Sequence, residues 1–144
     1  MEASITLDFS PYSENIIDIL KAFQKIGWNI YNPKNEVEYI PNGDSGMYNW
    51  LCEKMPENKF YDIISNKISK NEQVAINLFY NSGDEGITFI ANDTDRILLS
   101  IDINRHTLID QRHTDMVWYL NNIIYKFLDA DVKLLSYSLS EYDD

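Results

Sequence analysis

The sequence predicts a single α+β domain in which a largely antiparallel sheet packs against helices. Three observations support this. The 144 residues are 44% hydrophobic and 13% aromatic, a composition that builds one core. Strand-like and helix-like patterns follow one another without a repeat or a Pro/Gly-rich linker. Three successive strand-like segments are joined by short turns, which indicates antiparallel neighbours. We therefore expect one domain over residues 1–144, with the helices segregated from the sheet.

The first two elements are predicted to be a strand and a helix. Apolar and polar residues alternate strictly over 3–9, as in a half-buried strand. Ser10 and Pro11 are typical of a first helical turn, and apolar residues recur at helical spacing from 16 to 26. Gly27 suits the C-terminal end of this helix.

The following region is predicted to be irregular. Turn-forming residues interrupt it at 32–33 and again at 41–44. Asp44 or Ser45 can cap a short helix, and Pro56 fits the first turn of a longer one. Four elements are expected here: strands 28–31 and 37–40, and helices 46–54 and 56–70.

The second half predicts a three-stranded meander, a helix and a final strand. Residues 73–80, 87–91 and 96–103 are rich in β-branched and aromatic side chains. A long helix is expected from a cap at Thr114 or Asp115 to about residue 128. Seven of its residues are expected to face the core: Met116, Val117, Leu120, Ile123, Ile124, Phe127 and Leu128.

The final strand, over 132–139, is expected to precede an acidic tail. Each end of the predicted sheet is tied to a helix, and the element order is βα-αα-βββ-αβ. This order suggests an elaborated ferredoxin-like layout.

The charge limits the class of partner. Lys and Arg number 12 against 23 Asp and Glu, giving a net charge of −11. Such a field repels nucleic acid and anionic membranes and attracts basic proteins. The acidity concentrates in the second half of the chain, and two interpretations stand: general solubility, or a docking surface for a basic protein. We expect no nucleic-acid partner and no membrane contact.

The sequence also indicates a compartment. No run of 18 apolar residues is present, and the first residues lack the basic segment of a secretion signal. The single cysteine, Cys52, excludes an internal disulfide and fits a reducing cytosol. We therefore expect a cytoplasmic protein in which Cys52 is a small core residue.

The histidines are the first candidates for catalysis. His106 and His113 lie seven residues apart in a local echo, each between an arginine and a threonine. Such residues could cleave a phosphodiester by acid–base catalysis. Both lie on one polar connection before a capped helix, however, which favours surface or capping roles. No catalytic residue is predicted.

Metal and cofactor sites are not predicted either. His106, His113 and Asp115 supply ligand types without an established spacing. The pair Asp93 and Asp95 lacks the glycine and the distal glutamate of a calcium loop. The expectation is a protein that is not an enzyme and carries no metal and no cofactor.

Aromatic residues point towards protein binding. Ten tyrosines and three tryptophans are many for a core of this size. Tyrosine and tryptophan are typical interface anchors, although each can equally be a core residue with a solvated polar tip. Aromatics interleaved with acids suit a protein target, whereas nucleic-acid platforms interleave them with bases.

A further pattern is a series of segments spread over about residues 20–105. The segments are LKAFQKIGW (20–28), EYIPNGD (38–44), YNW (48–50), a helix ending near Lys67, QVAINL (73–78), GI (86–87) and INR (103–105). Together they resemble small immunity proteins of bacterial contact-dependent growth inhibition and other polymorphic toxin systems. The resemblance implies a cytosolic α+β protein that binds one cognate toxin domain, commonly a nuclease, and it supplies no active site.

The resemblance leads to a functional hypothesis with alternatives. The chain is expected to be a monomer that binds a basic toxin domain in a one-to-one complex through an acidic, tyrosine-rich surface. One alternative is an acidic adaptor or nucleic-acid mimic that binds another basic protein. Another is an enzyme with His106 and His113 in its site.

The predicted meander indicates where a toxin would bind. The turns at 84–85 and 93–95 lie at opposite ends of the middle strand. Strand pairing puts the first of them beside the end of strand 96–103, where more acids gather. The predicted toxin-facing set is Asp84, Glu85, Asp102 and Asp110, with Tyr80 as an aromatic anchor.

Overall fold

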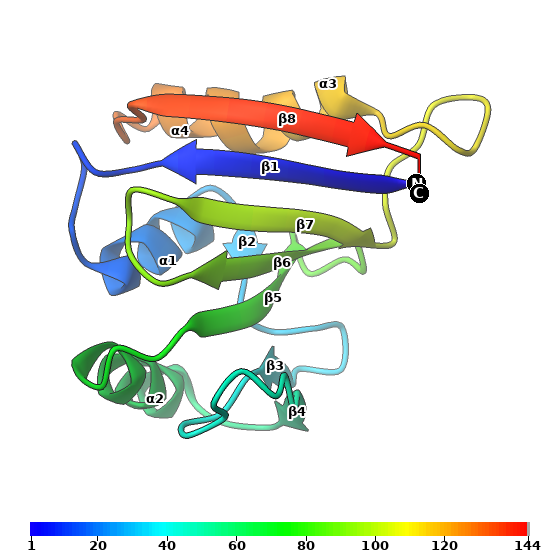
Figure 1. The fold of residues 1–144 in the computed structure, drawn as a ribbon. Helices are drawn as coiled ribbons and strands as arrows, with labels where there is room; N and C mark the ends of the chain where they lie inside the picture. The colour runs from blue at the N-terminus through cyan, green and yellow to red at the C-terminus, as the bar shows by residue number, and fades with distance from the viewer. Residues whose placement is uncertain (144) are drawn as a thin grey trace.

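A computed structural model of the chain describes residues 1–143. The strands are β1 Glu2–Asp8, β2 Trp28–Asn29, β3 Val37–Tyr39, β4 Leu51–Glu53, β5 Val74–Tyr80, β6 Gly86–Ala91, β7 Ile97–Ile103 and β8 Ser136–Tyr142. The helices are α1 Ile16–Lys25, α2 Glu57–Ser69, α3 Met116–Tyr119, the π-helical turn Leu120–Ile124 and α4 Tyr125–Asp129. These elements form one sheet with helices packed behind it (Figure 1).

The sheet confirms the predicted α+β class. Its order is β4-β3-β5-β6-β7-β1-β8, with β2 paired to β5, and the strand pairs among the described residues are antiparallel. The ferredoxin-like order is not confirmed, because that layout pairs two central strands in parallel. The predicted meander is confirmed as β5, β6 and β7, and the predicted helix 56–70 as α2.

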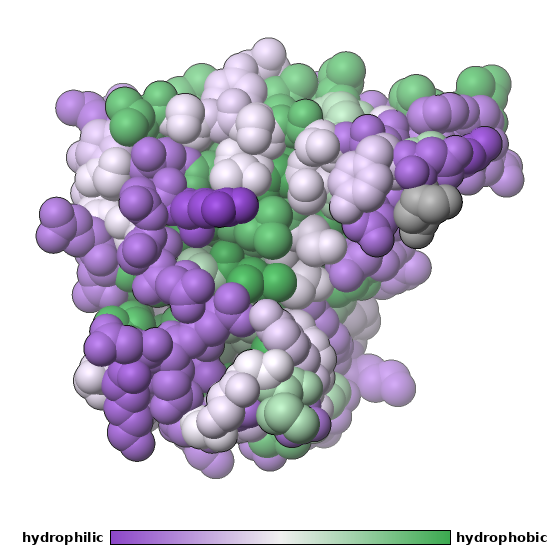
Figure 2. All heavy atoms as spheres, in the orientation of Figure 1, coloured by the Kyte–Doolittle hydropathy of each residue, from purple (hydrophilic) through white to green (hydrophobic). Residues whose placement is uncertain are grey.

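The sheet has a covered face and an open face. Along β1, the buried Ala3, Ile5 and Leu7 alternate with partly exposed polar residues. The buried side faces the helices, where phenylalanines pack edge to face with ring centroids 4.9–6.1 Å apart. Figure 2 shows the open face, on which an apolar patch is surrounded by hydrophilic side chains.

The first helix begins later than predicted. Its N-cap is Asn15, whose side-chain oxygen accepts the backbone N–H of Ile17 at 2.9 Å. Ser13 supports this cap by donating its hydroxyl to Asp18 at 2.7 Å. Because asparagine is among the strongest N-cap residues, Ser10 and the residues after it form a turn before the helix.

The predicted helix over 46–54 is wrong. The Asp44 carboxylate accepts the backbone N–H groups of Tyr48 at 2.6 Å and Asn49 at 2.9 Å. Gly46 and Tyr48 have positive φ angles of 77° and 55°, which a right-handed helix cannot contain. Residues 51–53 therefore extend as β4, an edge strand paired with β3.

Cys52 is consequently not a core residue. It lies on β4, which has a neighbouring strand on one side only, and its side chain is exposed. The expectation of a buried cysteine depended on the helix that does not form.

The last helix contains one π-helical turn, which corrects two expected core residues. Val117 is 62% exposed and Leu128 is 52% exposed, while Ile123 and Phe127 are fully buried. A π-helical turn adds a residue and rotates the positions on its two sides relative to each other. A strictly regular 3.6-residue period therefore assigns Val117 and Leu128 to the wrong face.

The final strand lies later than predicted. Residues 130–135 connect α4 to the last strand, and Val132 donates its N–H to the Phe127 carbonyl at 2.9 Å. The strand β8 then runs from Ser136 through Tyr142 along the whole of β1. Residues expected in an acidic tail are thus part of the sheet.

A buried lysine ties the irregular loop after β3 to α2. Lys67 is 1% exposed, and its ammonium donates to the Pro41 carbonyl at 2.9 Å. It also lies 3.6 Å from a carboxylate oxygen of Glu72, which accepts the N–H of Gly43 at 2.7 Å. A buried charge persists only when it is paired and hydrogen-bonded, so this arrangement fixes where the loop starts.

Replacing Lys67 tests this contact. Lys67→Met keeps the length of the side chain but leaves the Pro41 carbonyl and the Glu72 carboxylate without their donor. We expect the free energy of unfolding to fall by about 2 kcal/mol, measured by urea denaturation. Lys59→Met, on the exposed side of the same helix, is the matched control and should change it by less than about 0.5 kcal/mol. Equal effects of the two substitutions would contradict the role of Lys67.

Candidate functional site

Four segments meet at one end of the sheet, which we call the acidic end. The turn before β6 lies beside the end of β7, since Gly86 pairs with Ile103. The start of β1 and the end of β8 lie there too, because β1 is antiparallel to both β7 and β8 (Figure 1). Carboxylates outnumber guanidinium groups at this end. The acids are Glu2, Asp84, Glu85, Asp102, Asp110, Asp115, Glu141 and Asp143, and the arginines are Arg105 and Arg112.

The strand register brings together three residues of the predicted set. Asp84 and Glu85 lie in the turn before β6, and the Asn104 side chain donates to the Asp84 carbonyl at 2.9 Å. Asp102 lies on the open face of β7, where the Thr88 hydroxyl lies 3.1 Å from its carboxylate. These side chains share one end of the sheet, as the sequence predicts. Their role in binding stays a prediction.

The second acidic turn lies at the opposite end. Phe9, just after β1, donates its N–H to the carbonyl of Thr94 at 2.8 Å, which places the turn beside the end of that strand. The proximity of Asp93 raises the pKa of Asp95 through a side-chain hydrogen bond and charge repulsion. The two acidic turns are therefore separated by the length of the strands, as predicted.

Tyr80 lies on the helix side of the sheet and is only partly exposed. Its ring centroid is 4.9 Å from that of Trp28 and 5.4 Å from that of Trp118. Its hydroxyl donates to the Asn122 side chain at 2.7 Å, and the ammonium of Lys126 lies over its ring. Much of Tyr80 is thus already used by internal packing, and its role as an anchor stays a prediction.

Residues 104–115 form a hairpin-like projection, which we call the finger. It is the yellow loop between β7 and α3 in Figure 1. Thr107 and Thr114 pair as an antiparallel bridge, and Leu108 donates its N–H to the His113 carbonyl at 2.8 Å. The sequence predicted only a polar connection here.

The tip of the finger is closed by Asp110. Its carboxylate accepts the backbone N–H groups of Arg112 at 2.9 Å and His113 at 3.0 Å, and it also contacts the His113 ring. These bonds, led by that from the His113 side chain, lower the pKa of Asp110 to about 2. Asp110 is therefore ionised at neutral pH and shapes the tip.

The base of the finger is held against the last helix. The His106 ring stacks on Trp118 with centroids 3.8 Å apart and an interplanar angle of 11°. The backbone N–H of His106 donates to the buried Tyr119 hydroxyl at 3.0 Å, and its Nε2 atom lies 3.3 Å from Glu85. The finger is thus fixed both to the turn before β6, through Glu85, and to α3, through Trp118 and Tyr119.

A second set of contacts joins the finger to β8. Arg105 donates to the Arg112 carbonyl at 2.9 Å and to the Thr114 hydroxyl at 3.2 Å. Glu141 accepts the Thr114 N–H at 2.6 Å, and hydrogen bonds from Thr114 lower the pKa of Glu141. Arg112 pairs with Asp143. Both arginines of the acidic end are therefore occupied by internal partners.

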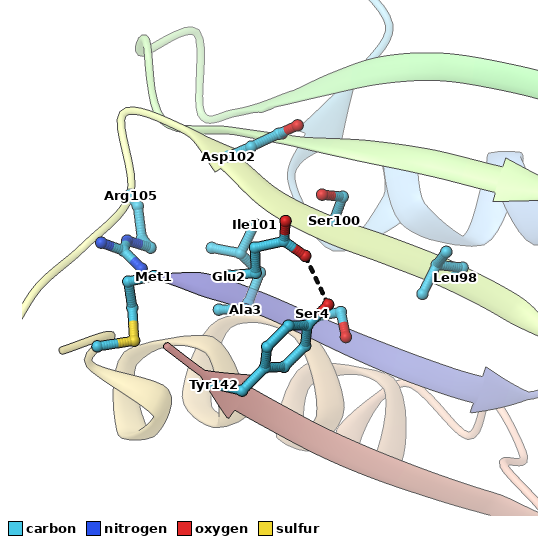
Figure 3. A pocket seen from close by; sticks show the side chains of 10 residues that line it. All are labelled: Met1, Glu2, Ala3, Ser4, Leu98, Ser100, Ile101, Asp102, Arg105 and Tyr142. Atoms are coloured by element: carbon cyan, nitrogen blue, oxygen red, sulfur yellow. Dashed lines mark hydrogen bonds between the residues drawn. The ribbon is translucent and has the colours of Figure 1, made fainter. Parts of the chain in front are cut away.

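A polar hollow of about 590 Å³ lies on the open face next to the finger (Figure 3). Arg105 lines it, and the Tyr142 hydroxyl donates to the Glu2 carboxylate at 2.5 Å across one side. The other lining residues are Met1, Ala3, Ser4, Leu98, Ser100, Ile101 and Asp102. The hollow adds carboxylate and hydroxyl groups to the acidic end.

The structure places the two histidines in different surroundings. His106 is half-buried at the base of the finger, while His113 is exposed at the tip and contacts Asp110.

Within residues 1–143, no group of three or more His, Cys, Asp or Glu side chains is arranged to hold a metal ion. Among these same residues, no helix has the length and apolar character needed to cross a membrane.

Two apolar residues of the site were missed by the sequence analysis. Leu108 and Ile109 lie at the finger tip, where Ile109 is fully exposed. The available signal was an apolar pair inside a connection that is otherwise polar.

No protein family, curated protein or solved structure matches the chain.

The pH dependence of stability tests the role of Asp110. A carboxyl whose pKa is lower in the folded chain stabilises the fold above its ordinary pKa of about 4 and loses that effect as pH falls towards 2. Asp110→Asn should therefore lower the melting temperature at pH 7, and the difference from wild type should shrink as pH falls from 5 to 2. Asp62→Asn, on the exposed side of α2, is the control and should show no such convergence. A difference that stays constant with pH would argue against this role.

Proposed function

We propose that the chain is an immunity protein that binds a basic toxin domain and neutralises it by occupying its surface, without catalysis. The observation that carries this proposal is the acidic end, where strand register and the finger gather carboxylates from distant parts of the sequence. The resemblance of residues 20–105 to immunity proteins supports it. The proposed partner is a cytoplasmic nuclease domain, bound one to one.

The physical basis is charge complementarity. A nuclease must bind a phosphate backbone and therefore presents a basic cleft. A carboxylate-rich surface is attracted to that cleft and occupies it or its rim. Arg105 lies 3.8 Å from Glu141, and Arg112 pairs with Asp143. The acidic end nevertheless keeps an excess of carboxylates, because it holds eight acids against these two arginines.

The acidic adaptor or nucleic-acid mimic is the competing proposal. It rests on the same carboxylates but predicts binding to many basic proteins, whereas an immunity protein has one cognate toxin. The immunity proposal predicts that a toxin gene lies immediately upstream of the chain's own gene. The C-terminal domain that such a gene encodes, which we call the upstream toxin domain, is the probe. Binding to this domain, with no binding to a toxin domain from an unrelated system, would favour immunity over mimicry.

The association rate tests electrostatic steering. Screening of exposed charges extends over about 8 Å at 0.15 M salt and shortens further as salt rises. We expect the rate constant for association with the upstream toxin domain to fall by at least about tenfold between 50 and 500 mM NaCl. Stopped-flow fluorescence measures it. An association rate independent of salt would refute steering.

Charge reversal locates the interface. Asp84→Lys with Glu85→Lys should weaken toxin binding by more than about 2 kcal/mol, since these residues lie in the acidic end. Asp93→Lys with Asp95→Lys is the matched control at the opposite end, and it should mainly slow association. Titration calorimetry, with a melting curve for each variant, compares the two. The opposite ranking would place the interface at the other end of the sheet.

A further inference from the structure

The tip of the finger exposes two apolar side chains to water. Ile109 is fully exposed and Leu108 is 48% exposed. Covering an isoleucine side chain is worth roughly 1.5–3 kcal/mol, so this exposure is unfavourable in the free chain. The side chains contribute little to the core, since they project beyond it at the tip of a loop. They are therefore available to a partner.

The tip is also preorganised. The Thr107–Thr114 bridge closes its base, and Gln111 donates its N–H to the Leu108 carbonyl at 2.9 Å. The Asp110 carboxylate fixes the backbone of the two residues that follow Gln111. A partner that covers Ile109 does not have to order a mobile loop, and this lowers the cost of binding.

The charges around the tip define the pocket that would receive it. Asp110 is next to Ile109 in sequence and is ionised at neutral pH, because its pKa is lowered to about 2. Glu141 and Asp143 lie at the base and side of the finger, where Asp143 pairs with Arg112. The charges of the tip itself pair internally, since Asp110 contacts the His113 ring and Asp143 pairs with Arg112. The acidic end around the tip holds eight acids against two arginines. An apolar tip that projects from such an end is complementary to an apolar pocket with a basic rim.

We propose that Leu108 and Ile109 are the apolar anchor of the complex and insert into a pocket of the toxin domain that has a basic rim. This inference rests on the proposed function. It assigns different kinetic roles to the two kinds of residue. The carboxylates raise the association rate, and the tip, once buried in the complex, lowers the dissociation rate. Buried apolar anchors at the centre of an interface are typical hot spots, whereas charges at its rim mainly set the association rate.

The test replaces the two apolar side chains of the tip with serine, which changes no charge. A Leu108→Ser, Ile109→Ser variant should bind the upstream toxin domain about 100-fold more weakly, the range of a hot spot. The loss should lie in the dissociation rate, and the salt dependence of association should stay that of wild type. Surface plasmon resonance gives both rates. The melting temperature should be unchanged, because the replaced side chains are exposed.

The control uses an exposed apolar residue away from the acidic end, whose exposure lies between those of Leu108 and Ile109. Leu135 is 67% exposed, and its N–H donates to the Asp8 carbonyl at 2.9 Å, at the far end of β1. Leu135→Ser should bind within threefold of wild type. If the tip variant binds as tightly as wild type, or if Leu135→Ser is equally weakened, the anchor is overturned while the immunity function stands. If wild type itself does not bind the toxin domain, both proposals fall.

Discussion

The buried indole of Trp28 makes the contact on which the geometry of the acidic end depends. Trp28 is fully buried, and its N–H donates to the Asn122 carbonyl at 3.0 Å. Leaving that donor unpaired would cost about 1–3 kcal/mol, so the helix must present a carbonyl at this point. Asn122 lies in the π-helical turn and also accepts the Tyr80 hydroxyl through its side chain. One residue of the helix thus ties the helix to both β2 and β5 of the sheet.

This contact positions the finger through a chain of aromatic rings. Trp118 lies one turn before Asn122, whose side-chain amide donates to the Trp118 carbonyl at 2.8 Å. The indole of Trp118 meets that of Trp28 edge to face, with centroids 6.1 Å apart, and it stacks on the His106 ring. The base of the finger therefore has a rigid support that reaches back to the core. An exposed loop held in this way can present its tip in one orientation.

The sequence was sufficient to predict an element where the spacing of its apolar residues matches the geometry of that element. Alternation predicted β1, and β-rich segments joined by short turns predicted the meander. Antiparallel register then placed Asp84, Glu85 and Asp102 at one end. It was insufficient where one side chain overrides the pattern: Asp44 takes backbone donors that a helix would need. Local pattern was equally insufficient for two other features. The π-helical turn adds one residue to the helical period. The finger depends on the stacking of His106 on Trp118, a contact between different elements that no local pattern indicates.

The polar part of the open face supports the proposal that the partner binds at the acidic end. Its polar groups bond to one another across the strands: Asn77 donates to Glu38 at 2.9 Å, and the Thr88 hydroxyl donates to Asn77 at 2.8 Å. Asn32 donates to the second oxygen of Glu38 at 2.7 Å. A partner covering these groups would have to desolvate donors and acceptors that are already satisfied, with no new bond in return. At the acidic end, by contrast, the side chain of Ile109 is fully exposed to water, and carboxylates outnumber guanidinium groups. These two features are the reason why we propose that a basic partner binds where the finger projects.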